Sequence, residues 1–258
     1  MKFPIVGFIF FWDYLTTRNK TKKKFLNAVY IDEKNACVYG YNRSHFRNYI
    51  PGWLDAKPQS LGKPIKDTMV PCIFACHHEA GGVMYRSGTP KVRPRAGGFK
   101  FIKRNVGAVV MCEALIEVFI PFAQDCGATL FVADCGCKIH LWQCVALCRE
   151  FGISVYPRAN QDHTFKGYPA YSPKTMPLDE CIFPLLASKT SKFMKLYSDK
   201  KRRQSTLQYL LYKNIGKIWN SDEIQNLCRR GVLNQEKVCK NIIETNGYLL
   251  EESDSESN

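Results

Sequence analysis

Residues 130–157 read LFVADCGCKIHLWQCVALCREFGISVYP, and this stretch decides the fold that the sequence predicts. The apolar run at 130–133 is typical of a buried strand, and it delivers Asp134 to the C-terminal end of that strand. Apolar side chains then recur at roughly helical spacing over residues 138–151, and residues 153–156 indicate a second strand. A strand, a helix and a strand with short links form a βαβ unit, so we expect the two strands to be parallel.

The segment before this unit predicts strands in hairpin-like succession. Residues 26–31 form a β-prone run that ends in an Asp-Glu pair, and residues 37–41 indicate another strand after a turn at 34–35. Further apolar strands are expected at 68–76 and 81–85. We expect these strands to belong to the same sheet as the βαβ unit.

A helix is expected between these strands and the βαβ unit. Residues 89–98 are rich in Pro, Gly and Arg and predict an irregular segment. Residues 105–126 carry apolar side chains at helical spacing and predict a long helix, in which Pro121 is a candidate break. The resulting order favours a mixed α/β sheet with helices on both faces.

Two further motifs follow the βαβ unit, namely YSP at residues 171–173 and PLDE at residues 177–180. Pro177 suits the first turn of a helix, and Thr175 can cap it. Acidic residues in a first turn complement the helix dipole, so the Asp-Glu pair also has an interpretation as an ordinary helix start.

The order of these motifs resembles the catalytic core of mariner-type transposases, a group of DDE/DDD enzymes in the Tc/mariner superfamily. The matching pieces are Asp134 with His140, GISVYP at 152–157, YSP at 171–173 and PLD at 177–179. The resemblance covers about residues 26–192. Some features depart from the family pattern. Cys135 and Gly136 follow Asp134, where the family usually has Asn and Ala. The spacing from Asp134 to Asp179 is also longer than is typical, and residues 158–168 form the apparent insertion.

The resemblance implies an RNase H-like fold, with a mixed sheet of about five strands flanked by helices. It also implies that Asp32, Asp134 and Asp179 are the catalytic and metal-binding residues. Asp32 and Asp134 would bind both of two Mg²⁺ or Mn²⁺ ions, and Asp179 would hold the second. Water activated on one ion would nick DNA, and the freed 3′-hydroxyl would attack target DNA. Glu33 and Glu180 are the alternative ligands, because each adjoins a predicted one.

Several of these residues also have an ordinary structural interpretation. Asp32 fits a strand-end turn, because Asp is common there. The resemblance places His140 near the site, where it would help to position the phosphate or the second acid, but a surface histidine with ordinary hydrogen-bond partners is an equal alternative.

An alternative function for the whole chain is that of a catalytically inactive, transposon-derived protein that binds DNA or another partner.

Zinc binding without catalysis is a rival hypothesis of another class. Cys72-x₃-Cys76-His77-His78 and Cys135-x-Cys137-x₂-His140 contain zinc-type ligands. Neither has the C-x₂-C spacing that is typical of a zinc site, and the first lies within a strand pattern, where alternate residues face opposite ways.

Composition favours a nucleic-acid partner. The 258-residue chain has 37 Lys and Arg against 23 Asp and Glu, a formal charge of +14, and its pI is about 9.2. No stretch is apolar for the roughly 20 residues that a membrane-spanning helix needs. Twelve dispersed cysteines indicate a reducing compartment, which is the nucleus, or the cytoplasm of a prokaryote. The expected partners are therefore DNA, as transposon ends and target, and no membrane, and a homodimer is compatible with this.

We expect four regions along the chain. Residues 1–25 form an N-terminal extension or linker, and residues 26–192 form the RNase H-like catalytic domain. Residues 193–250 form a basic helical extension, and residues 251–258 are an acidic, serine-rich tail that is expected to be disordered.

Overall fold

The computed structural model describes residues 25–37, 69–93, 98–102, 104–158, 168, 175–198 and 204–244. Several sequence predictions lie outside the described residues. These are the extension at 1–24, the strand residues 38–41, the YSP motif at 171–173 and the tail at 251–258.

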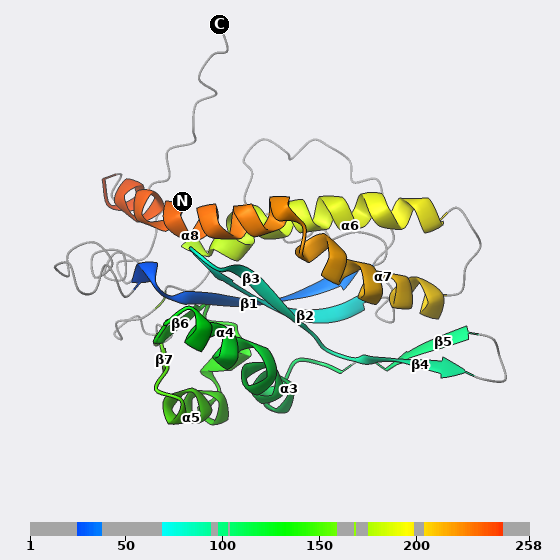
Figure 1. The fold of residues 1–258 in the computed structure, drawn as a ribbon, viewed down its shortest axis with the longest axis horizontal. Coiled ribbons are helices and arrows are strands. Elements are labelled where there is room, and N and C mark those ends of the chain that lie inside the picture. Colours follow the sequence, from blue (N-terminus) through cyan, green and yellow to red (C-terminus); the bar gives the residue numbers. More distant parts are fainter. Residues whose placement is uncertain are drawn as a thin grey trace, which may run out of the picture.

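Five strands form a mixed sheet in the order β3-β2-β1-β6-β7 (Figure 1). They are β1 (Val29–Cys37), β2 (Met69–His77), β3 (Gly81–Arg86), β6 (Leu130–Ala133) and β7 (Ser154–Val155). β2 is antiparallel to β1 and β3, whereas β6 is parallel to β1 and to β7. The predicted βαβ unit and its parallel strands are therefore confirmed, and the strand that ends before Asp134 is the direct neighbour of β1.

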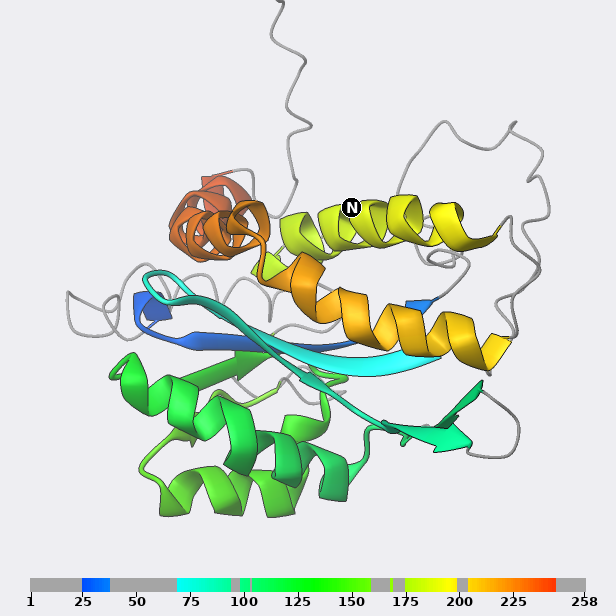
Figure 2. The same ribbon diagram turned by 45° about the vertical axis from the view of Figure 1, so that its right-hand side comes forward.

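Helices cover both faces of this sheet, as the sequence predicts (Figure 2). One face carries α3 (Ala108–Ala114), η3 (Leu115–Phe119), α4 (Ile120–Asp125) and α5 (Trp142–Glu150). The other face carries η6 (Leu178–Ile182), α6 (Phe183–Ser198), α7 (Gln204–Trp219) and α8 (Asp222–Glu244). Within the described ranges, none of these helices combines the length and the apolar character needed to cross a membrane.

Side chains of β1 alternate between two cores, because the sheet is covered on both faces. Val29 and Ile31 pack into the core beneath α3, α4 and α5. Tyr30 and Ala36 pack into the core beneath α6, α7 and α8. Since the period is two residues, the even-numbered positions of this strand share the face that η6 and α6 cover.

The C-terminal helices are part of the same packed body as the sheet. Trp219 of α7 is fully buried, and its ring centroid lies 4.6 Å from that of Phe74 on β2. A Cβ on Gly82 of β3 would lie only 2.6 Å from the Trp219 ring, so this close approach requires glycine. The helical character predicted for residues 193–250 is thus confirmed in α7 and α8, and both helices are buried against β2 and β3.

The predicted turn at residues 34–35 is wrong. β1 continues through both residues to Cys37, with Lys34 opposite Cys72 and Asn35 opposite Pro71 of β2. Local turn propensity is a weak signal, and the long antiparallel pairing with a buried strand overrides it.

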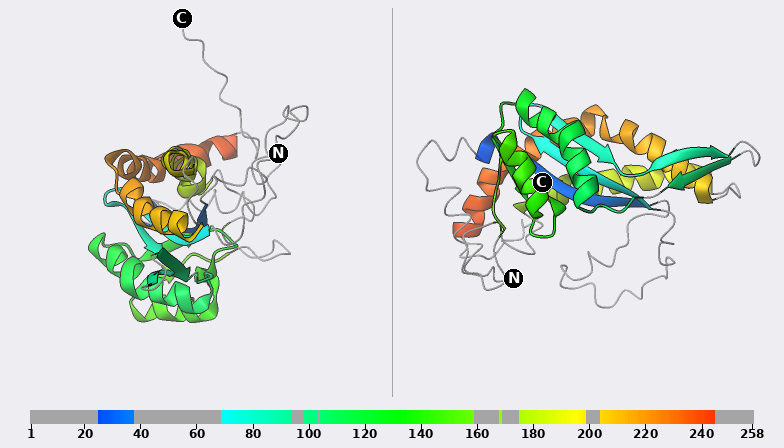
Figure 3. Two further views of the ribbon diagram at one scale, coloured as in Figure 1. Left: turned by 90° about the vertical axis from the view of Figure 1, so that its right-hand side faces the viewer. Right: turned by 90° about the horizontal axis from the view of Figure 1, so that it is seen from below.

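The irregular segment predicted at residues 89–98 is also wrong. Its described residues belong to a separate two-stranded sheet of β4 (Thr89–Arg93) and β5 (Gly98–Ile102), which extends away from the main sheet (Figure 3). Pro90 is tolerated because each strand of a two-stranded sheet has a free edge. At the base of this hairpin, the Ser87 hydroxyl donates to the carbonyl of Arg104 at 2.7 Å.

The predicted long helix forms, but Pro121 does not break it. α3, η3 and α4 follow one another without a gap, and η3 is a π-helical turn that ends two residues before the proline. A proline inside an α-helix clashes with the carbonyl four residues earlier, and the wider π turn relieves that clash.

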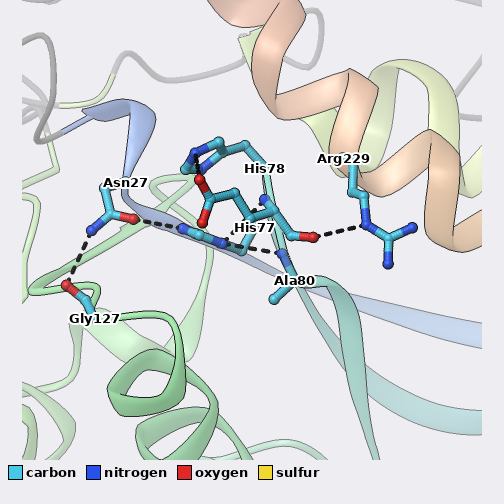
Figure 4. Close-up of polar contacts among 7 residues, drawn as sticks. Asn27, His77, His78, Ala80, Gly127 and Arg229 are labelled. Carbon is cyan, nitrogen blue, oxygen red and sulfur yellow. Dashed lines mark hydrogen bonds and ion pairs between the residues drawn. The ribbon is translucent and has the colours of Figure 1, made fainter.

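A polar network closes the end of the sheet that lies away from the C-terminal end of β6 (Figure 4). His77 is fully buried, and its Nε2 lies 2.8 Å from Oδ1 of Asn27, whose amide donates to the carbonyl of Gly127. Its Nδ1 accepts from the backbone N–H groups of Glu79 and Ala80 at 3.3 and 3.4 Å. Nδ1 is therefore unprotonated, and the neutral ring ties the start of β1 to the β2–β3 turn.

We expect His77 to make folding sensitive to acid. Burial and the neighbouring His78 lower the pKa of His77 from 6.5 to about 4, although Glu79 opposes this shift. Because the unfolded state takes up the proton first, stability is complete above about pH 6.5 and falls progressively towards pH 4. In urea unfolding at pH 7.5, the free energy of unfolding of His77→Gln should be about 1–3 kcal/mol lower than that of wild type. Between pH 6.5 and pH 4 it should then fall less steeply than that of wild type. An equally steep decline in the variant would contradict this assignment.

Candidate active site

The sheet register places Asp32 and Asp134 at the same level of two neighbouring strands. Ile31 of β1 pairs with Ala133 of β6, and each aspartate is the next residue of its strand. Asp32 does not end its strand as predicted, because β1 continues to Cys37, whereas Asp134 directly follows β6. Asp32 and Asp134 each lie two residues after a side chain of the core beneath α6–α8, namely Tyr30 and Val132. The two carboxylates therefore share that face of the sheet.

Asp179 reaches this face from the helical side. It is the second residue of η6, a π-helical turn that leads directly into α6. Leu178 and Ile182 of that turn are fully buried against the sheet, which orients the turn and leaves Asp179 half-buried between its neighbours. The predicted helix start at residue 177 is confirmed, and it carries the third acidic residue of the prediction.

The three carboxylates repel one another. Asp32 is 8% exposed, and burial raises its pKa well above the usual range, as do the negative charges of Asp179 and Asp134. Burial also raises the pKa of Asp179, with the charge of Asp134 adding to it and Lys34 opposing it. The three acidic side chains therefore form one electrostatic cluster, from segments far apart in the sequence.

Lys34 is a residue of this cluster that sequence reasoning missed. Its Nζ lies 3.3 Å from Oδ1 of Asp179. The sequence predicts a turn at Lys34, and the signal that points to the site instead is its position two residues after Asp32 on one strand.

The loop after β6 holds Asp134 by its backbone and its side chain. Oδ1 of Asp134 accepts from the backbone N–H groups of Gly136 and Cys137 at 2.8 and 2.9 Å. Nε2 of His140 lies 2.9 Å from the carbonyl oxygen of Asp134, so this nitrogen carries the proton and donates. His140 thus lies beside the site, as the resemblance implied, and it orients the backbone of the second acid.

Glu33 faces the opposite side of β1 and anchors this same loop. Its Oε1 accepts from the backbone N–H of Lys138 at 2.5 Å. Burial raises its pKa, and hydrogen bonds from Lys138 and Cys137 oppose that shift. The position of Glu33 favours a loop anchor over an alternative ligand. Glu180, the other alternative, is exposed on η6 and stays a prediction.

The zinc hypothesis finds no support in the described part of the chain. Cys72 and Cys76 lie on the same strand, so a four-residue spacing separates them by roughly 13 Å. The Cys135 thiol donates a hydrogen bond to the carbonyl of Tyr168 at 3.0 Å. Nε2 of His140 is hydrogen-bonded to the backbone carbonyl of Asp134 and so does not face a zinc ion. Among the described residues, no three His, Cys, Asp or Glu side chains are arranged to enclose an ion as they stand.

The donor chemistry of the three aspartates nevertheless fits a hard divalent cation. Carboxylate oxygens are the ligands that Mg²⁺ and Mn²⁺ prefer. The buried carboxyl of Asp32, held next to two further acids, carries an unfavourable charge that a bound cation would relieve.

We expect Asp32→Asn to stabilise the metal-free protein. The folded-state pKa of Asp32 is raised, so its ionised form at pH 7.5 opposes folding, and the amide removes that charge. The amide oxygen can still accept the 2.7 Å hydrogen bond from the Glu33 N–H. In EDTA the free energy of unfolding should rise by about 1 kcal/mol, which is a melting-temperature increase of about 2–4 °C. Asp125→Asn, at an exposed position, is the matched control, and an Asp32→Asn variant no more stable than this control would refute the repulsion.

Comparison with known proteins gives matches among solved structures only. No family model matches the sequence, and no curated protein matches it. A Mos1 strand transfer complex is 16% identical, with a TM-score of 0.60 over 95% of this chain and 62% of that chain. This chain therefore spans less than two thirds of the length of that protein.

Structures of an isolated catalytic domain match over nearly their whole length. The Mos1 transposase catalytic domain with raltegravir and Mg is 14% identical, with a TM-score of 0.56 over 95% of this chain and 96% of that chain. The catalytic domain of Mos1 mariner transposase alone is 14% identical, with a TM-score of 0.54 over 95% of each chain. The chain has the RNase H-like fold of the mariner transposase catalytic domain, as the resemblance implied.

Proposed function

We propose that this chain carries out transposase-type DNA-strand cleavage and strand transfer. The single observation that supports this most directly is that Asp32 and Asp134, at the same level of neighbouring strands, and Asp179, on the helical segment that covers this face of the sheet, lie close enough for their charges to interact. Acidic residues that repel one another in a partly buried cluster are unfavourable for folding alone, and they are typical of a site that binds cations. The RNase H-like fold of the chain is consistent with this chemistry.

Asp32, Asp134 and Asp179 would hold two Mg²⁺ or Mn²⁺ ions. When bound, such an ion pair neutralises the charge that develops on the attacking and leaving oxygens of a phosphodiester. Mos1 catalytic-domain structures have been determined with Mg and with Mn, which agrees with this choice of ions.

The residues of this chain contribute orientation and charge. Asp32 would supply a buried carboxylate from the rigid middle of the sheet, and Asp134 one from a loop fixed by Gly136, Cys137 and His140. Glu33 would keep that loop against β1 through Lys138. The proposed reaction therefore depends on groups that packing holds in position before DNA binds.

DNA is the proposed partner, as transposon ends and as target. The formal charge of +14 favours a polyanionic partner, and release of counterions from DNA would make binding dependent on salt. The matching Mos1 structures include a paired-end complex and a strand transfer complex, which is consistent with this proposal.

A catalytically inactive DNA-binding protein is the second candidate. Two observations favour it. Lys34 pairs with Asp179, and in the described part of the chain no three His, Cys, Asp or Glu side chains are arranged to hold a metal ion. In that case the basic charge would act without cleavage.

Cleavage of supercoiled plasmid DNA separates these two candidates. With Mg²⁺ or Mn²⁺, the wild-type chain should convert supercoiled DNA to open circles, and EDTA should stop it. Asp134→Asn should lower this rate at least about 100-fold, because loss of metal-borne charge stabilisation removes several kcal/mol. DNA binding, measured by fluorescence anisotropy, should change little.

Glu150→Gln is the matched control, since it removes an exposed carboxylate at the end of α5. It should cleave and bind as wild type does. Cleavage by Asp134→Asn at the wild-type rate would refute the site, and DNA binding without any cleavage by wild type would favour the inactive protein.

A further inference from the structure

A basic side chain of β1 crosses to the helical segment that carries the third acid. Nζ of Lys34 lies 3.3 Å from Oδ1 of Asp179 in η6 and 5.0 Å from the ring centroid of Phe183, the first residue of α6. An ammonium group near an aromatic ring gains from the negative charge of the ring face. Asp179 and Phe183, which lie one helical turn apart, therefore both contact the Lys34 ammonium.

This ammonium acts on more than the acid that it touches. Its charge lowers the pKa of Asp179, through the direct contact, and that of Asp32, which precedes it by two residues on the same strand face. In both cases burial is the larger effect and acts in the opposite direction. Lys34 therefore offsets part of the repulsion among the carboxylates.

The surroundings of Lys34 distinguish it from an ordinary surface ion pair. Lys189 and Glu223 form such a pair between α6 and α8 at 2.5 Å, and the Lys189 side chain is 31% exposed, against 30% for Lys34. The carboxylate partner differs, since Glu223 is 59% exposed and Asp179 is 22% exposed. Water therefore screens the charge of Glu223 more than that of Asp179, so the charge of Lys34 matters more to its partner than the charge of Lys189 does.

We infer that Lys34 is an internal counter-ion of the carboxylate cluster, and that it competes with divalent cations for Asp179. This rests on the proposed function, because the same three carboxylates would bind the ions. One oxygen of Asp179 faces the lysine, so a cation bound there must replace or weaken that contact. Lys34 thereby stabilises the metal-free protein, and it weakens the affinity for the ion to the extent that the contact is lost when the ion binds.

Mn²⁺ binding to the full chain, measured by isothermal calorimetry without DNA, tests this inference. Lys34→Met should bind Mn²⁺ about three- to tenfold more tightly than wild type, as expected for removal of one partly buried competing charge. In EDTA the same variant should melt about 2–4 °C lower, and Mn²⁺ should raise its melting temperature more than that of wild type. Lys34→Arg keeps the charge and should stay within about twofold of wild type in Mn²⁺ affinity.

Lys189→Met is the matched control and should bind Mn²⁺ as wild type does. A double-mutant cycle with Asp179→Asn provides a second measurement, because the effect of Lys34→Met on the metal-free melting temperature should largely disappear in that background. Unchanged or weaker Mn²⁺ binding by Lys34→Met would overturn the inference and leave the proposed function standing. If wild type binds no Mn²⁺, the proposed function and this inference both fail.

Discussion

The organisation of this molecule depends on the burial of one sheet on both faces. Each side chain of β1 points to one face of the sheet or the other, and the alternation is set by the strand itself. Tyr30 occupies the core beneath α6–α8, so Asp32 and Lys34 emerge on that face, while Glu33 emerges on the other. A one-residue slip of β1 would reverse these assignments and expose its apolar residues, so the register of the core and that of the acidic cluster are the same constraint.

The carboxylate cluster is unfavourable for folding, and its surroundings offset that cost. Asp32 is buried next to like charges, which raises its pKa, and such an arrangement persists only where the rest of the structure stabilises it. Two apolar cores, one on each side of the sheet, supply that stability, and Lys34 supplies one local counter-charge. A stable fold that holds destabilising acids together is typical of a functional site.

The loop after β6 shows how the position of one catalytic candidate depends on residues that lie outside the acidic triad. Gly136 and Cys137 donate to the carboxylate of Asp134, and His140 donates to its backbone carbonyl. Glu33 reaches the same loop from the neighbouring strand through the backbone of Lys138. Asp134 is therefore positioned by its own loop and, through Lys138, by the neighbouring strand. Most of these contacts are hydrogen bonds of backbone groups, which cannot be predicted from the residue types alone.

Much of the fold and the elements that carry the acids could be predicted from local patterns. The apolar run before Asp134, the helical spacing after it and the helix start at Pro177 all depend on short-range periodicity and capping chemistry, and the structure contains them. The resemblance to mariner-type transposases rested on the same segments. That the three aspartates are metal ligands stays a prediction from sequence and resemblance, although they do form one electrostatic cluster.

The sequence by itself thus determined the parallel βαβ unit, the long helix before it and the acidic residues that could share a site. Only the tertiary structure decided that β1 runs through Lys34, that β4 and β5 pair, and that a π turn accommodates Pro121. It also decided that Lys34 meets Asp179 and that Glu33 anchors a loop. The physical reason is range, because periodicity and capping act within a few residues, whereas strand pairing and charge contacts join segments that only the packed chain brings together.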